Sequence, residues 1–196
     1  MKRCLPDRDG LHLLDLATGT ADQLIFLSQD PRVHSGVGMD LAERMLDIGR
    51  KKIERLDLAD SYDLRVGDAD KVPIEDEVAD VVTISFGIRN VCSVEGALKE
   101  MVRVLKPGGR VLILEFSLPK NRMFRQLYLF YFRHMLPRIG GLISGDAYAY
   151  RYLNQTVESF PYGEEFCSLM RAAGFEDVKA RPLTFGIASI YQGDKP

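Results

Sequence analysis

The chain has 196 residues, a length within the range of one domain, and hydrophobic residues make up 46% of it, enough for a sizeable core. Its 26 basic and 28 acidic side chains give a formal net charge of −2, which excludes a general electrostatic attraction to nucleic acid. Three scattered cysteines favour a reduced, cytoplasmic protein, and three histidines are too few to predict a metal site. The sequence contains neither a signal peptide nor an apolar run near the roughly 18 residues of a membrane span.

Apolar runs alternate with amphipathic segments over the first part of the chain. The apolar runs predict strands at Leu11–Leu16, Val33–Met39, Tyr62–Val66, Val78–Ser85 and Val111–Phe116. Between them, the spacing predicts helices over Asp22–Ser28, Ala42–Leu56 and Val94–Leu105, the last of which the breaker cluster Lys106–Gly109 ends. Strands that alternate with helices form a parallel sheet covered on both faces, and we expect one α/β domain over residues 1–196.

The composition changes after the fifth predicted strand. Residues 122–136 (RMFRQLYLFYFRHML) mix aromatic side chains with cations and predict a helix. One interpretation is a lid or a membrane-contacting surface that admits a hydrophobic substrate, and the other is a helix that packs on the core. The apolar stripe serves either purpose: Phe124, Leu127, Tyr128, Tyr131 and Met135.

The C-terminal part predicts one more helix and two more strands. Residues Glu164–Ala173 have helical spacing, Gly174–Phe175 begins a strand, and a last strand runs over Leu183–Tyr191. A final hairpin of this kind can close the sheet with one antiparallel strand.

The stretch Leu13–Asp22 (LLDLATGTAD) reads as a strand, a tight turn and a helix start. Gly19 lies where the chain reverses, and a residue without a Cβ lets the backbone approach a ligand closely. Asp40 ends the next apolar run 21 residues later, near the roughly 20 expected for an acid that binds ribose hydroxyls. The pattern predicts a pocket for a nucleoside cofactor, although any α/β turn can contain Gly and Asp by chance.

The turn does not fit a dinucleotide. Its sequence, Thr18-Gly19-Thr20-Ala21-Asp22-Gln23, lacks the G-x-G-x-x-G fingerprint, and Asp22 at the helix start repels a pyrophosphate. Together with Asp15 before the turn, this acid suits a ligand with ammonium and sulfonium charges, such as S-adenosylmethionine. Ligands of open parallel sheets sit at the carboxyl ends of the strands, where Asp68 and residues 86–90 also lie.

Three blocks of the sequence resemble the ubiquinone and menaquinone biosynthesis C-methyltransferase family. They are residues 80–91 (DVVTISFGIRNV), 103–117 (RVLKPGGRVLILEFS) and 152–161 (YLNQTVESFP). The resemblance implies a Rossmann-like class I methyltransferase fold with strand order 3-2-1-4-5-7-6. It also implies that S-adenosylmethionine methylates a polyprenylated demethyl-quinol, either demethylmenaquinol or 2-polyprenyl-6-methoxy-1,4-benzoquinol, and leaves S-adenosylhomocysteine.

The resemblance also implies which residues form the site. Asp40 would hold the ribose, Asp68 and Ala69 would meet the adenine ring, and Ser85 lies on the strand that leads to the substrate side. The full set of implied cofactor residues is Asp15, Thr18, Gly19, Asp40, Leu41, Asp68, Ala69 and Ser85.

Arg89 and Asn90 are the candidates for catalysis, because a quinol ring carbon becomes nucleophilic when a ring hydroxyl is deprotonated. Arginine is a poor general base, so we expect it to stabilise the phenolate or to position a water that takes the proton. The alternative is that Arg89 forms an ion pair that supports its loop. Tyr150 and Tyr152 are candidates for lining the quinol pocket.

The sequence departs from the family pattern in two places. Ala21 stands where the family often has glycine, and about ten residues precede the first strand, without the family's Y-D-x-M-N signature. From this we expect a missing N-terminal cap, a cofactor site open to water and weak activity. A non-catalytic cofactor-binding or assembly subunit is therefore an alternative, as is an NAD-dependent oxidoreductase, which the glycine spacing disfavours. The sequence is compatible with a homodimer and with a peripheral membrane contact through residues 122–136.

Overall fold

One seven-stranded sheet forms the centre of the computed structural model, which describes residues 1–136, 138 and 147–196. The strand order is β3-β2-β1-β4-β5-β7-β6, and only β7 runs antiparallel to its neighbours. The strands are β1 (Leu11–Leu16), β2 (Val33–Asp40), β3 (Tyr62–Val66), β4 (Ala79–Ser85), β5 (Leu105–Phe116), β6 (Glu176–Leu183) and β7 (Ala188–Asp194). The predicted α/β class, strand order and single antiparallel strand are confirmed.

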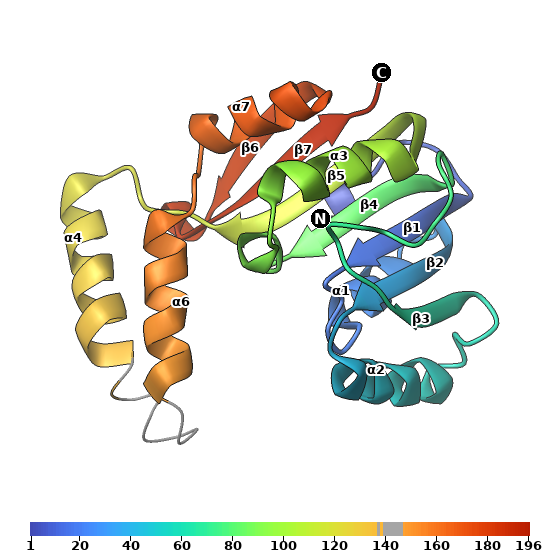
Figure 1. Cartoon of the computed structure of the whole chain (residues 1–196), viewed down its shortest axis with the longest axis horizontal. Helices are drawn as coiled ribbons and strands as arrows, with labels where there is room; N and C mark the ends of the chain where they lie inside the picture. Colours follow the sequence, from blue (N-terminus) through green and yellow to red (C-terminus); the bar gives the residue numbers. More distant parts are fainter. Residues whose placement is uncertain (137, 139–146) are drawn as a thin grey trace.

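Helices cover both faces of this sheet (Figure 1). Helices α3 (Val94–Val104) and α7 (Glu164–Ala173) pack on one face, where Leu98, Met101 and Phe166 lie in a core with no solvent exposure. Helices α1 (Asp22–Ser28) and α2 (Glu43–Arg55) pack on the other face through side chains such as Leu27 and Leu46. The amphipathic spacing read from the sequence therefore reflects two apolar layers around a parallel sheet.

A separate pair of helices stands at the carboxyl end of β5 (Figure 1). Helix α4 (Arg122–Phe130) continues into a π-helical turn, η3 (Tyr131–Met135), and lies beside α6 (Ala147–Ser159). Their contact is a small apolar cluster of Leu118, Tyr128, Phe132 and Val157. Asn154 ties the pair together, because its Nδ2 donates to the carbonyl oxygen of Phe132 at 2.6 Å.

Several predicted bounds differ from the structure by a residue, and three differences are larger or bear on the topology. Helix α3 ends before Lys106–Gly109 as predicted, but β5 already begins at Leu105, because this cluster forms an irregularity in the β4–β5 register and its backbone pairs with Lys195. The predicted last strand, Leu183–Tyr191, is wrong at its start. Thr184, Phe185 and Gly186 all have positive φ and form a 3-10 turn, η4, so the chain reverses inside that prediction. Helix α6 was not predicted.

Candidate active site

The turn between β1 and α1 has an unusual backbone. Ala17, Gly19 and Ala21 have φ of 49°, 57° and 63°, in the left-handed region that glycine adopts without strain. Ala21 therefore occupies a conformation that favours the glycine expected there. Two alanines keep this unfavourable backbone conformation only because contacts with the surrounding structure fix the turn, and such strained backbone is common at ligand sites.

Asp40 at the end of β2 holds this turn in place. Its Oδ2 accepts a hydrogen bond from the Gly19 N–H and its Oδ1 accepts one from the Ala42 N–H, both at 2.8 Å. Each carboxylate oxygen has more than one lone-pair site, so both can still accept from a second donor on the pocket side. The spacing of Gly19 and Asp40 in the sequence thus corresponds to direct contact in the structure.

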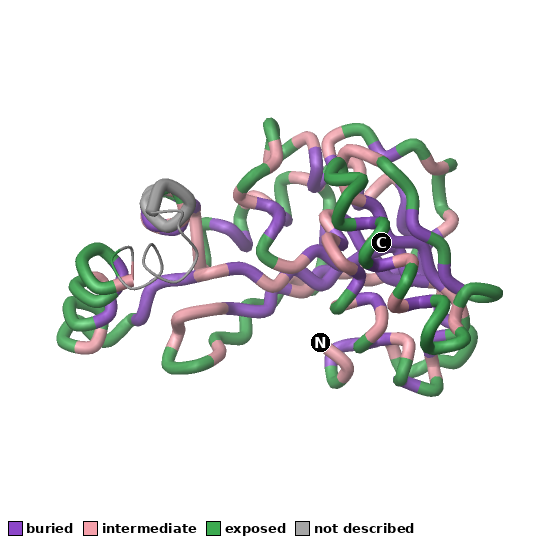
Figure 2. Tube along the Cα trace, turned by 90° about the horizontal axis from the view of Figure 1, so that it is seen from below, coloured by how far each residue is buried: buried purple, intermediate pink, exposed green. Residues whose placement is uncertain are grey.

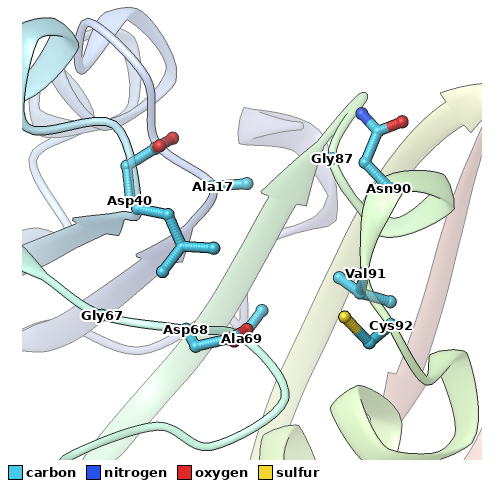
Figure 3. A pocket seen from close by; sticks show the side chains of 10 residues that line it. Ala17, Asp40, Gly67, Asp68, Ala69, Gly87, Asn90, Val91 and Cys92 are labelled. Atoms are coloured by element: carbon cyan, nitrogen blue, oxygen red, sulfur yellow. The ribbon is translucent and has the colours of Figure 1, made fainter.

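A cavity of about 240 Å³ opens beside Asp40 at the carboxyl ends of β1, β2, β3 and β4 (Figure 3). The residues that line it come from four loops: Ala17, Asp40, Leu41, Gly67, Asp68, Ala69, Gly87, Asn90, Val91 and Cys92. Five of the predicted site residues are among them, namely Asp40, Leu41, Asp68, Ala69 and Asn90. The sheet edge that the sequence predicted is therefore where the pocket lies.

Two contacts hold the walls of this cavity at a fixed spacing. A Cβ on Gly87 would lie 2.5 Å from the Cβ of Ala17, so only glycine lets the loop after β4 approach the first turn this closely. On the other side, Oδ2 of Asp70 accepts from the backbone N–H groups of Cys92 and Ser93, at 2.8 and 3.2 Å. The loops after β3 and β4 are thereby joined.

Asp15 lies beneath the turn and has no exposed surface. Its carboxylate accepts hydrogen bonds from the hydroxyls of Thr18, at 2.6 Å, and Thr83, and burial raises its pKa to about 6 against the opposing effect of these two hydrogen bonds. The structure thus places Asp15 and Thr18 behind the pocket wall. Asp22, the other acid of the turn, accepts from Lys52 Nζ at 2.7 Å and lines no part of this cavity.

Arg89 forms an ion pair in the interior. Its Nη1 donates to Oε1 of Glu115 at 2.8 Å and to the carbonyl oxygen of Phe86 at 2.6 Å, and the Glu115 side chain has no exposed surface. Burial raises the pKa of the Glu115 carboxyl, although the Arg89 charge opposes this effect. Within the described part of the chain, Nε of Arg89 and Oε2 of Glu115 are buried without a hydrogen-bond partner.

Asn90 and Tyr152 connect the cavity to the helix pair. The Tyr152 hydroxyl of α6 donates to Oδ1 of Asn90 at 3.3 Å, which brings two predicted substrate residues together. Ser85 lies at the end of β4, and its Oγ is buried with no partner among the described residues. Tyr150 lies in α6, but its side chain is outside the described part of the structure.

The comparison with protein families decides the assignment. Residues 1–195 match the model of the ubiE/COQ5 methyltransferase family. The chain belongs to the ubiE/COQ5 methyltransferase family. This membership excludes the alternative of a dinucleotide-dependent oxidoreductase, in agreement with the glycine spacing of the first turn.

Curated relatives agree with this family. The chain is 45% identical over 194 residues to the "Ubiquinone/menaquinone biosynthesis C-methyltransferase UbiE" of Geobacter sulfurreducens, which covers 98% of the chain and 75% of that relative. It is 46% identical over 186 residues to the "Demethylmenaquinone methyltransferase" of Thermus thermophilus, covering 94% of the chain and 82% of that relative.

Solved structures share the fold of this family member at low sequence identity. A Haloferax volcanii putative methyltransferase, in complex with the activator Trm112, superposes with a TM-score of 0.76 at 16% identity, over 100% of this chain and 87% of that chain. The phosphoethanolamine N-methyltransferase 2 of Haemonchus contortus, in complex with S-adenosyl-L-methionine, gives 0.72 at 16% identity, over 100% of this chain and 51% of that chain. These likenesses bear on the fold alone.

Sequence reasoning missed several residues of the site. Gly67, Gly87, Val91 and Cys92 line the cavity, and Glu115 is the partner of Arg89. The signal for the two glycines was present, because each lies in the loop directly after a predicted strand. Glu115 sits inside the block that resembled the family, but its pairing with Arg89 depends on β4 and β5 being neighbours.

Proposed function

We propose that this chain transfers a methyl group from S-adenosylmethionine to a ring carbon of a polyprenylated demethyl-quinol. The substrate is demethylmenaquinol or 2-polyprenyl-6-methoxy-1,4-benzoquinol, in menaquinone or ubiquinone biosynthesis. One observation carries this proposal: relatives with about 45% identity over nearly the whole chain are named as a C-methyltransferase of ubiquinone and menaquinone biosynthesis and as a demethylmenaquinone methyltransferase. The protein acts in the cytoplasm or at the periphery of a membrane.

The residues at the cavity fit the nucleoside part of the cofactor. Asp40 presents two carboxylate oxygens that can each accept a ribose hydroxyl while keeping their backbone donors. Leu41, Ala69 and Val91 supply apolar surface for a flat ring, and Asp68 offers an acceptor for an exocyclic amine. A cavity of about 240 Å³ suits the nucleoside, so the amino-acid end of the cofactor extends along the turn at Thr18 and Gly19.

Asp15 would act on the cofactor through this turn. It is fully buried and its carboxylate is held by two threonine hydroxyls, so it shapes the Thr18–Gly19 backbone and adds negative charge below the site. In this assignment Asp15 and Thr18 position the turn, Gly19 allows its close approach, and Ser85 lies on the substrate side with a hydroxyl available for a donor or acceptor.

When bound, S-adenosylmethionine supplies an electrophilic methyl group, so the protein's task is to align the quinol and favour its phenolate. Asn90, in the cavity wall, and the Tyr152 hydroxyl bonded to it would hold a ring oxygen of the quinol. Arg89 adds a positive charge that stabilises the phenolate, or its guanidinium positions a water that takes the proton.

A transfer assay tests the proposal directly. The protein is incubated with methyl-labelled S-adenosylmethionine and chemically reduced demethylmenaquinone or the demethylated benzoquinone, and mass spectrometry locates the label. We expect label on a ring carbon, and none when the oxidised quinone replaces the quinol. Binding of S-adenosylmethionine without transfer to either quinol would instead favour a non-catalytic cofactor-binding or assembly subunit.

A further inference from the structure

The outward side of α4 and η3 carries an exposed apolar row. Met123, Leu127, Phe130 and Tyr131 are 80%, 65%, 57% and 42% exposed, and their spacing places them on one side of the helix. Figure 2 shows α4 at the far end of the molecule with most of its length exposed. A contiguous exposed apolar row of this kind is typical of an interaction surface.

The residues of the predicted stripe lie on both sides of the helix. Tyr128 of the stripe points inward, where it stacks on Phe132 with ring centres 5.1 Å apart and packs against α6, whereas Leu127 and Tyr131 of the stripe are exposed. The inner side confirms the core-packing interpretation, but it leaves the outer row without a role. We refer to the row Met123, Leu127, Phe130 and Tyr131 as the α4 surface.

A further exposed aromatic side chain, from another part of the chain, extends the α4 surface at the start of the helix. Phe185, at the tip of the η4 turn, is 84% exposed and has a φ of 58°. Its ring meets that of Phe124 edge-on, with centres 5.6 Å apart, so the turn lies against α4. A positive φ is unfavourable for a bulky residue, and so is the exposure of its apolar ring to water. A functional role therefore explains the position of Phe185 better than folding stability does.

The charge around the α4 surface is one-sided. Between Leu118 and Arg138 the sequence has five Lys or Arg residues and no Asp or Glu, although the chain as a whole has a net charge of −2. The basic residues are Lys120, Arg122, Arg125, Arg133 and Arg138. Among them, Arg133 pairs with Glu158 of α6. An apolar row flanked by cations fits a layer with an apolar interior and anionic headgroups.

We propose that the α4 surface, with Phe185, docks on a lipid bilayer that contains anionic lipids. Pairing with a second copy of the chain through the same surface is disfavoured, because it would bring two sets of arginines together. This docking does not depend on the methyl-transfer chemistry. It would bring the cavity close to the bilayer, because α6 packs on the inner side of α4 and carries Tyr152 to the rim of the cavity. A substrate with a prenyl tail would then reach the site from the membrane.

Vesicle sedimentation tests the proposal. Vesicles of phosphatidylcholine alone are compared with vesicles that also contain phosphatidylglycerol. The variants are Leu127→Ser with Phe130→Ser for the apolar row, and Arg122→Glu with Arg125→Glu for the charge. Ile48→Ser, at an apolar residue of α2 that is 49% exposed, is the control away from the α4 surface. Circular dichroism establishes that each variant is folded.

We expect the wild-type chain and Ile48→Ser to sediment with the anionic vesicles, and both double variants to partition at least about tenfold more weakly. Leu127→Ser with Phe130→Ser loses apolar surface that would be buried in the bilayer. Arg122→Glu with Arg125→Glu loses the attraction of two cations to the anionic headgroups. Equal sedimentation of the double variants and the wild type, or no sedimentation of the wild type, would overturn the proposal. So would a dimer in analytical ultracentrifugation that both double variants abolish. Transfer to a short-chain, water-soluble quinol should be unchanged in all variants, which separates a failure of docking from a failure of the enzyme.

Discussion

Arg89 and Glu115 form an ion pair that joins the loop after β4 to the end of β5, with 2.8 Å between Nη1 and Oε1. The Arg89 side chain is only 10% exposed and that of Glu115 is fully buried, so neither charge can be left alone without cost. The arginine proposed to stabilise a phenolate is thus also a structural residue. The two roles can be separated by experiment.

We expect Glu115→Ala to destabilise the protein by about 3–5 kcal/mol, because it leaves the guanidinium buried without its partner. The double variant Arg89→Met/Glu115→Leu, which removes both charges and keeps their volume, should recover most of this loss. Urea unfolding measures both. The double variant should then bind S-adenosylhomocysteine but transfer methyl groups at least about 100-fold more slowly. Transfer at the wild-type rate would show that the ion pair only supports the loop.

Burial of Asp15 makes the stability depend on pH. Its folded-state pKa of about 6 is higher than the 3.8 of the unfolded chain, so the folded state binds the proton more tightly. This stabilising contribution is complete below the unfolded pKa and is lost as the pH rises through about 6. The shift corresponds to about 3 kcal/mol.

The expected result is a pH-dependent difference between the wild type and Asp15→Asn. From about pH 4 to pH 7 the free energy of unfolding of the wild type should fall by about 2 kcal/mol relative to that of the variant, as measured in urea. Comparison with the variant cancels the titration of all other groups. A difference that stays constant over this range would show that Asp15 is not a buried carboxylate of this kind.

The close approach of Gly87 to Ala17 predicts that a side chain at position 87 clashes with Ala17 and that a smaller residue at position 17 relieves this clash. Gly87 has an ordinary φ of −108°, so the effect of Gly87→Ala comes from packing against the Ala17 Cβ at 2.5 Å. We expect a loss of about 1–3 kcal/mol in stability together with weaker cofactor binding. Adding Ala17→Gly removes the opposing methyl at a position of positive φ and should restore most of both. Simple addition of the two single effects would contradict this geometry.

Cys92 gives chemical access to the cavity. It is exposed and lines the pocket, whereas Cys4 and Cys167 are buried. We expect N-ethylmaleimide to modify Cys92 first in the folded protein and to block binding of S-adenosylhomocysteine, and prior binding of that compound should slow the modification. Cys92→Ser should bind normally and keep its binding after treatment. A modified protein that binds as well as the untreated one would place the cofactor elsewhere.

The sequence predicted those parts of the fold that depend on local pattern. Strands β1 and β3 and helices α1 and α7 agree with their predicted bounds because each has clear periodicity and an abrupt end. The place of Asp40 and Asp68 at the cavity was predicted because Asp40 ends β2 and Asp68 lies two residues after β3, and parallel strands bring such positions to one edge. The α6 helix and the η4 turn were missed. Polar and aromatic side chains obscure the apolar positions of α6, and nothing in Thr184 or Phe185 signals a positive φ.

Asp40 is the residue on which the cofactor assignment depends, and isothermal titration with S-adenosylmethionine and S-adenosylhomocysteine tests it most directly. The wild type should bind both compounds, Asp40→Ala should lose binding of both, and Asp40→Asn, which keeps an acceptor for the Gly19 N–H, should bind more weakly than the wild type. An exposed acid of α2, replaced in Asp47→Ala, is the control and should change nothing. Wild-type affinity in Asp40→Ala would contradict the account, because the ribose would then be held by some other group.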